Sequence, residues 1–274
     1  MDGCYKLTYI ILMEKVNLFG LDFWSASDEN QVADILIDAS NQGLFQNNNI
    51  EFIITPNAYD ITLFFTRNTD IYDALRHSAV ILPDGMPLVW LGKLSRPALK
   101  KRITGSDLFP VLWQKIKERK KKAFFILPSQ EIGNKLSQEY SDMQFAVPAF
   151  FEETDDAYIQ EFVSDVIEKI RDLRPDFIFL GLSNPKQQKI ALKVETLLHS
   201  DDFNCLIAPI GASFEFYLNM KKRAPLFFQK IGGEWFYRLL KEPKRMWKRY
   251  TLGNIQFIFL TIRFLAKKYI PKKA

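Results

Sequence analysis

Polar residues follow four predicted strands of this chain at the points where the strands end. Asp84 is the only carboxylate directly beyond one of these strands. A carboxylate can take a proton from a hydroxyl group as that oxygen forms a bond, so Asp84 is our candidate general base. The four clusters are residues 55–57, 83–85, 181–187 and 211–213.

Each cluster has a simpler explanation when taken alone. Asp84-Gly85 is a common turn sequence. The segment from Thr55 to Asn57 could be a strand exit followed by a helix cap, and Gln187 could be a surface residue on a first helical turn. Four clusters on one edge of a sheet would indicate a ligand site more strongly than any one of them.

A fifth polar segment, "RITGSDL", runs from Arg102 to Leu108. It places Gly105 and Ser106 at the start of a predicted helix, with Asp107 in the first turn. Backbone N–H groups at a helix start suit an anion such as a phosphate. The alternative is that Ser106 or Asp107 only caps the helix.

These clusters need a parallel sheet to bring them together. Apolar runs that read as strands alternate with helical patterns, which is typical of α/β proteins. We therefore expect a Rossmann-like, mostly parallel sheet with helices on both faces and with ligands beyond the carboxyl ends of its strands. The stretch "EKVNLFGLDF" is predicted as an opening strand and a turn. The clearest helices are predicted at 29–41, 86–94, 106–119, 155–173 and 186–198.

The C-terminal part of the chain carries a different charge. Residues 221–274 contain 15 Lys and Arg but only two acids, Glu234 and Glu242, whereas the rest of the chain is net negative. We predict an N-terminal extension at 1–15, a catalytic domain at 16–220 and a basic helical appendage at 221–274. Such an appendage could hold nucleic acid, lie on a membrane or bind an anionic small molecule.

Composition excludes several other classes. Cys4 and Cys205 fit no metal or redox spacing, and Cys205 lies in an apolar run that predicts a buried strand. His77 and His199 end predicted helices without a partner at i+4, so a histidine metal site is not expected. No apolar stretch is long enough for a spanning helix, and we expect a cytoplasmic protein.

The order of "TPN", "PDG", "RITGSDL", "GLSNPKQQ", "KRAP" and "GGEWFYRLLKEPKRMWKRY" resembles the WecG/TagA/CpsF family of bacterial glycosyltransferases. The resemblance covers most of the chain. It implies transfer of a sugar from a UDP-sugar to an undecaprenyl-diphosphate-linked sugar, with inversion at the anomeric carbon and without a metal or other cofactor. The donors it implies are N-acetylmannosamine, its uronic acid or a related hexose.

The resemblance also implies roles for single residues. The family's base falls on Asp84, and its supporting polar pair falls on Thr55 and Asn57. The appendage is implied to neutralise the donor diphosphate through Arg238 and Arg245. The remaining residues implied to bind substrate are Arg102, Gly105, Asp107, Gln187, Arg223 and Arg249 (or Lys248 in place of Arg249).

Departures from the family pattern bear on the donor sugar more than on the reaction type, and they include "GLSNP", where the family form is richer in glycine. Gln188 stands where the family usually has Glu, and Phe214-Glu215 stands where it usually has Phe-Asp. The residues implied to carry the chemistry are all present.

The implied transfer reaction would explain why the appendage is basic. Departure of UDP builds negative charge on a phosphate, and guanidinium groups can meet that charge with paired N–H donors. In the stretch 253–270, Ile255, Phe259 and Ile262 share one helix face with Leu265 and Tyr269. This pattern predicts a helix on an anionic membrane, at the inner face of the bacterial plasma membrane. The alternative is a helix buried between copies of a homo-oligomer.

Three other functions compete with this interpretation. A nucleic-acid-binding module would leave the strand-end clusters unexplained, and the acidic body would oppose it, so no nucleic-acid partner is expected. A Rossmann dehydrogenase would need Gly-x-Gly-x-x-Gly after its first strand, and "NLFGLDFWSAS" lacks it. A catalytically degenerate scaffold in a polysaccharide assembly complex is the main alternative.

Overall fold

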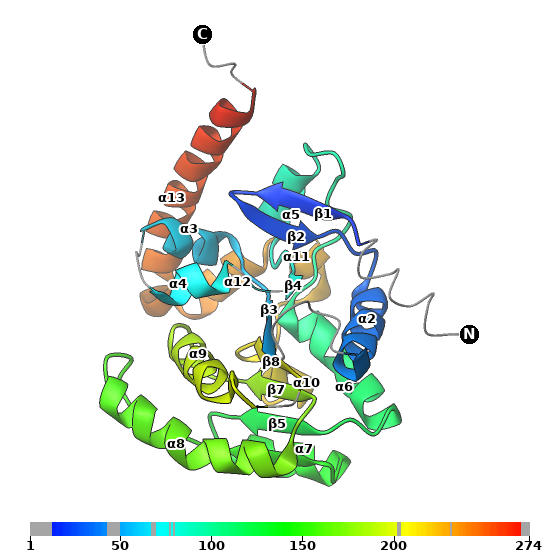
Figure 1. Cartoon of the computed structure of the whole chain (residues 1–274). Helices are drawn as coiled ribbons and strands as arrows, with labels where there is room; N and C mark the ends of the chain where they lie inside the picture. The colour runs from blue at the N-terminus through cyan, green and yellow to red at the C-terminus, as the bar shows by residue number, and fades with distance from the viewer. Residues whose placement is uncertain are drawn as a thin grey trace, which may run out of the picture.

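The computed structural model describes residues 13–42, 50–66, 70–76, 78, 80–201, 204–230 and 232–269. Within them eight strands form one sheet in the order β1-β2-β4-β3-β8-β7-β5-β6 (Figure 1). Every neighbouring pair is parallel except β1 and β2, which confirms the predicted sheet. The strands are β1 (Lys15–Leu18), β2 (Leu21–Trp24), β3 (Ile50–Ile54), β4 (Val80–Ile81), β5 (Ala123–Ile126), β6 (Met143–Ala146), β7 (Phe177–Leu180) and β8 (Cys205–Pro209).

Helices cover both faces of the sheet, as predicted. Successive strand residues point to opposite faces, so Ile178 and Leu180 of β7 join one apolar layer while Phe177 and Phe179 join the other. The first layer includes α3 (Ala58–Thr66), α4 (Asp70–Leu75), α8 (Asp156–Leu173) and α9 (Lys186–Leu198). The second includes α2 (Glu29–Gln42), α6 (Gly105–Glu118) and α7 (Gln130–Glu139). Short helices α5 (Met86–Gly92) and α10 (Ser213–Tyr217) follow β4 and β8.

The sequence-based assignment is wrong or incomplete at two places. The opening strand and turn are in fact an antiparallel hairpin, β1 and β2, with Phe19 and Gly20 at φ 59° and 81°. Two consecutive positive φ angles are what a tight hairpin turn requires. Strand β6 was not predicted. It has only four residues, and their side chains do not alternate clearly between buried and exposed positions, so the sequence carries little strand pattern there.

Cys205 and His199 lie within the described residues. Cys205 is buried in β8, as predicted, and this burial raises the pKa of its thiol. His199 caps the C-terminus of α9, with its Nδ1 3.5 Å from a carboxylate oxygen of Glu195. Cys4 and His77 lie outside the described residues. In the part of the chain that the structure describes, no group of three or more His, Cys, Asp or Glu is placed to hold a metal ion.

The basic C-terminal segment folds back onto the core as α11 (Leu226–Lys230), α12 (Glu234–Lys241) and α13 (Pro243–Tyr269) (Figure 1). Helix α13 packs along α3, where a Cβ added at Gly253 would lie 2.6 Å from the Tyr59 ring. The ring of Phe19, in the β1–β2 turn, lies 5.8 Å from that of Phe257 and 4.9 Å from that of Phe264, between centroids. Among the described helices, none has the length and apolar character needed to cross a membrane.

We predict that Phe257→Ala loosens α13 from the core. The side chain is 7% exposed and packs against Phe19, so its removal leaves a cavity that should cost about 3 kcal/mol. Hydrogen exchange of residues 243–269 should accelerate. Phe259→Ala, on the same helix but 74% exposed, is the matched control and should leave exchange nearly unchanged. Equal exchange in the two variants would contradict the packing described for α13.

Candidate active site

A cleft of about 900 Å³ opens beyond the carboxyl ends of the central strands. The four polar clusters predicted to share one edge all contribute to its lining. Gly105 and Ser106 at the start of α6 and Arg238 of α12 also line it. The lining residues that follow strands include Thr55 and Asn57 after β3, Asp84 after β4, Ser183 and Gln187 after β7, and Gly211 and Ser213 after β8.

Asp84 lies where β4 meets α5, beside the end of β3. Its backbone N–H donates to the carbonyl of Pro56 at 3.1 Å, which ties the two strand ends together. Burial raises the pKa of Asp84 to about 7; Glu234 and Asp60 add to the rise, while Arg102 and Arg238 oppose it. A carboxylate that titrates near neutral pH is suited to accept and release a proton.

Asn57 caps the helix that follows β3. Its side-chain oxygen accepts hydrogen bonds from the backbone N–H groups of Tyr59 (2.9 Å) and Asp60 (3.2 Å). The backbone N–H of Asn57 donates to the Asp60 carboxylate. The cap interpretation therefore holds for Asn57, although the residue also lines the cleft. Asp60 in turn accepts a hydrogen bond from the amide of Asn184, which links the β3 and β7 loops.

Gln187 is buried, so its interpretation as a surface residue is wrong. Its amide nitrogen donates to the carbonyl of Pro209 at 3.4 Å, and its oxygen accepts from the backbone N–H of Gly211 at 3.0 Å. Gly211 has φ 58°, a conformation that favours glycine. Gln187 thus lines the cleft and also fixes the turn after β8.

The start of α6 is capped by Thr104, whose hydroxyl donates to the Asp107 carboxylate and accepts from the Asp107 N–H. A Cβ at Gly105 would lie 2.9 Å from the Cβ of Ile210, so the close contact between this helix and the β8 loop requires glycine. Asp107 does not line the cleft. Together with Arg102 it lines a neighbouring groove of about 620 Å³.

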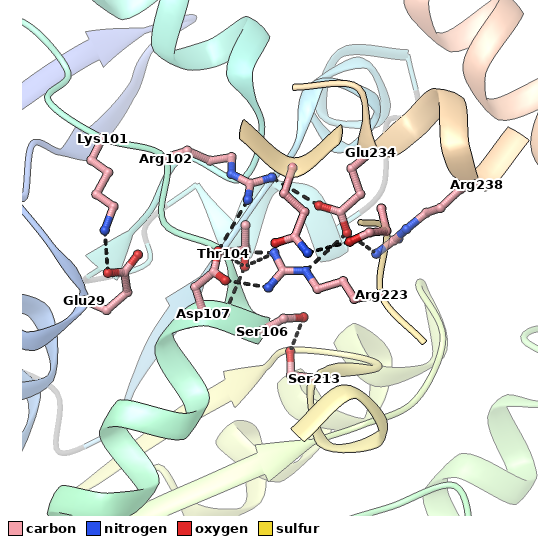
Figure 2. Close-up of polar contacts among 12 residues, drawn as sticks. Glu29, Lys101, Arg102, Thr104, Ser106, Asp107, Ser213, Arg223, Glu234 and Arg238 are labelled. Carbon is pink, nitrogen blue, oxygen red and sulfur yellow. Dashed lines mark hydrogen bonds and ion pairs between the residues drawn. The ribbon is translucent and has the colours of Figure 1, made fainter. Parts of the chain in front are cut away.

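Three arginines share two carboxylates beside the cleft (Figure 2). We call this group the arginine cluster; it consists of Arg102, Arg223, Arg238, Asp107 and Glu234. Arg223 binds both oxygens of Asp107, at 2.5 and 3.2 Å. Glu234 accepts from Arg102 at 3.2 Å, from Arg223 at 3.4 Å and from Arg238 at 3.1 Å. The cluster therefore joins α12 to the start of α6.

The cluster shifts the pKa of its members. Burial alone would raise the pKa of Asp107, but the hydrogen bonds and charge of Arg223 more than offset it and hold that pKa below its usual value. Burial of Glu234 is likewise outweighed, by Arg223, Arg238 and Arg102, so the pKa of this carboxyl is also lowered. Both acids are ionised at neutral pH, and with three guanidiniums they leave one surplus positive charge.

The predicted substrate-binding arginines thus differ in position. Arg238 lines the cleft, Arg102 lines the neighbouring groove, and Arg223 is bound to Asp107 and Glu234. The side chains of Arg245 and Arg249 lie outside the described residues. Glu234, which binds all three arginines, was not among the predicted site residues. It is one of only two acids in a basic segment, and this could have indicated that it pairs with arginines.

A carboxylate with a raised pKa at the strand ends of a parallel sheet, next to a surplus of guanidinium charge, indicates an enzyme that acts on an anionic substrate. The chain belongs to the Glycosyl transferase WecG/TagA/CpsF family, which matches residues 16–271. It is therefore a glycosyltransferase.

The chain is also similar to curated glycosyltransferases. The chain is 30% identical over 194 residues (69% of this chain, 71% of the relative) to the N-acetylglucosaminyldiphosphoundecaprenol N-acetyl-beta-D-mannosaminyltransferase of Bacillus subtilis strain 168. It is 28% identical over 257 residues to the Staphylococcus aureus MRSA252 protein of that name, covering 92% of each chain. The Bacillus spizizenii protein of that name is 31% identical over 202 residues, 72% of this chain and 74% of the relative.

We predict that Glu234→Gln weakens the contact between α12 and the core. Glu234 is the carboxylate shared by all three arginines, and its loss should lower the free energy of unfolding by about 1–3 kcal/mol at pH 7 in a urea titration. Because the pKa of Glu234 is lowered in the fold, its contribution is present at neutral pH and is lost as the pH falls through that value.

The difference between this variant and the wild type should therefore shrink below about pH 4. Glu161→Gln, at an exposed position on α8, is the matched control and should have little effect. A Glu234→Gln protein as stable as this control at pH 7 would show that the cluster does not hold α12 in place.

Proposed function

We propose that this enzyme transfers N-acetylmannosamine or a closely related sugar from a UDP-sugar to a sugar linked to undecaprenyl diphosphate, with inversion and without a metal ion. The observation that carries the proposal is the position of Asp84, a carboxylate of raised pKa in a cleft that Arg238 also lines. The family and the names of the relatives support the choice of donor and acceptor.

The proposed reaction is a single displacement. The acceptor hydroxyl oxygen forms a bond to the anomeric carbon of the donor sugar while Asp84 takes the hydroxyl proton. The bond from the anomeric carbon to the β-phosphate oxygen breaks, and UDP leaves with that electron pair. Because the nucleophile enters opposite the leaving group, the configuration at the anomeric carbon inverts. Thr55 and Asn57 border Asp84 and would orient the two substrates.

The arginine cluster would take the part of a divalent cation. Negative charge grows on the departing diphosphate, and Arg238 is the member of the cluster that lines the cleft. It is bound by Glu234 in the structure, so a diphosphate would compete with this carboxylate for the same guanidinium. The surplus positive charge of the cluster favours that exchange. Arg102 and Arg223 would support it through the shared acids.

We further propose that the enzyme works in the cytoplasm, as a peripheral protein on the inner face of the plasma membrane. Helix α13 exposes Ile255, Phe259 and Ile262 along one stripe, at 64%, 74% and 61% exposure. Basic residues accompany this stripe on the same helix. The apolar side chains would enter the lipid interface while the lysines and arginines meet anionic headgroups. A contact between copies of the chain is the competing use of this surface.

The chemical step is tested with Asp84→Asn. Loss of the base should lower kcat by about 10²–10⁴-fold, measured as sugar transfer to a soluble undecaprenyl-diphosphate–sugar analogue. In the wild type, kcat/KM should rise with pH through an apparent pKa of about 7, because the base must be deprotonated. Turnover should persist in EDTA. Undiminished transfer by Asp84→Asn would exclude Asp84 as the base, and a wild type inactive with every UDP-sugar would favour the scaffold.

A stability measurement separates this role from misfolding. The pKa of Asp84 is raised in the fold, so its ionisation costs stability as the pH rises toward about 7. Asp84→Asn should therefore melt above the wild type at pH 8, with a smaller difference at pH 5. Asp165→Asn, at an exposed position on α8, is the control for both assays.

Membrane binding is tested by replacing Ile255, Phe259 and Ile262 together with Ser. Sedimentation with vesicles of phosphatidylcholine and phosphatidylglycerol should fall at least about tenfold, because each side chain removes apolar area that would enter the lipid. Gln256→Ser, at an exposed polar position on the same helix, is the control. Unchanged vesicle binding would contradict the proposal, and a shift from dimer to monomer in light scattering would assign the surface to self-association.

A further inference from the structure

One wall of the cleft forms an apolar recess that neither the proton transfer nor the leaving group uses. Leu63 and Phe64 of α3, Leu75 of α4 and Gln188 of α9 line the cleft there. They are 7%, 4%, 3% and 9% exposed, respectively. Helix α4 packs against both α3 and α9 (Figure 1), and the four residues line the same cleft, so we treat them as one surface. We call it the α3–α9 recess.

Gln188 carries the side-chain amide of this recess, and Tyr72 of α4 lines the same cleft. Its side-chain oxygen is buried and accepts no hydrogen bond in the described part of the structure. Its neighbour Gln187 differs, because both ends of that amide are bonded to backbone groups. A buried amide oxygen without a donor is uncommon in folded proteins. At the wall of a ligand cleft, a group of the ligand can supply the missing donor.

The chemistry of the recess selects the kind of group that fits. A side-chain amide offers an acceptor and two donors, and a half-turn about its last torsion exchanges them. Next to the apolar wall of Leu63, Phe64 and Leu75, the matching group is itself an amide that bears a methyl. A hydroxyl would pair with Gln188 but leave the wall uncovered. A carboxylate would find no cation among the four residues of the recess.

We propose that the α3–α9 recess binds the 2-acetamido group of a substrate sugar, with the amide of Gln188 paired to the acetamido amide and the methyl packed on the apolar wall. The inference rests on the proposed function and extends it by naming the residues of the cleft that recognise the N-acetyl group. Donor and acceptor sugars of the named relatives both carry an N-acetyl group. The experiment must therefore distinguish these two sources.

The test compares Gln188→Leu with the wild type on matched substrates. The first arm uses UDP-N-acetylmannosamine and UDP-mannose with one N-acetylglucosamine-diphosphate-lipid acceptor. The second arm keeps the first donor and exchanges the acceptor for its glucose counterpart. Gln160→Leu, an exposed glutamine on α8, is the control. Calorimetric binding of UDP and of each UDP-sugar adds a readout that needs no acceptor.

We expect Gln188→Leu to lower kcat/KM about 10- to 100-fold for the acetamido substrate and less than about threefold for its hydroxyl counterpart. A loss confined to the donor arm, with weaker binding of UDP-N-acetylmannosamine but unchanged binding of UDP, assigns the recess to the donor. A loss confined to the second arm assigns it to the acceptor.

Equal losses with all substrates, or no loss, would overturn the inference, because a residue that only holds the fold would not discriminate between sugars. These results differ from a failure of the proposed function. In that case the wild type itself would transfer no sugar from any UDP-sugar.

Discussion

The ion pairing of three arginines with two carboxylates is the interaction on which the arrangement of this enzyme depends. Asp107 stands at the start of α6, whereas Arg223, Glu234 and Arg238 come from the C-terminal segment. These contacts tie α12 to the edge of the cleft that Arg238 lines. Partly buried ion pairs tolerate the loss of a partner poorly. The cluster therefore holds α12 in place and also carries a surplus positive charge beside the cleft.

The same cluster acts on the candidate base. Arg102 and Arg238 lower the pKa of Asp84 while Glu234 raises it, on top of the larger effect of burial. A bound diphosphate would add negative charge near these groups and would push this pKa upward. Guanidiniums near both anions would counter that rise. In the proposed reaction, charge on the leaving group and basicity of Asp84 would thus be coupled through residues that lie far apart in sequence.

Much of this arrangement could be predicted from local patterns. Helix α9 begins and ends where its apolar spacing indicates, and the strand ends that carry Asp84 and Asn57 meet because parallel strands must align. The contact of Glu234 with Arg102 could not be predicted, because the two residues are 132 positions apart. The place of Phe257 against the β1–β2 turn is equally non-local. Such tertiary contacts leave no periodic signal in the sequence.

Helix α13 has two distinct faces. One of its faces packs on the core through Phe257 and Phe264, and another exposes Ile255, Phe259 and Ile262. Only Glu242 separates α13 from α12, which carries Arg238 into the cleft. If the exposed face binds a membrane as proposed, that contact and the position of Arg238 would depend on the same packed segment, because only one residue joins the two helices.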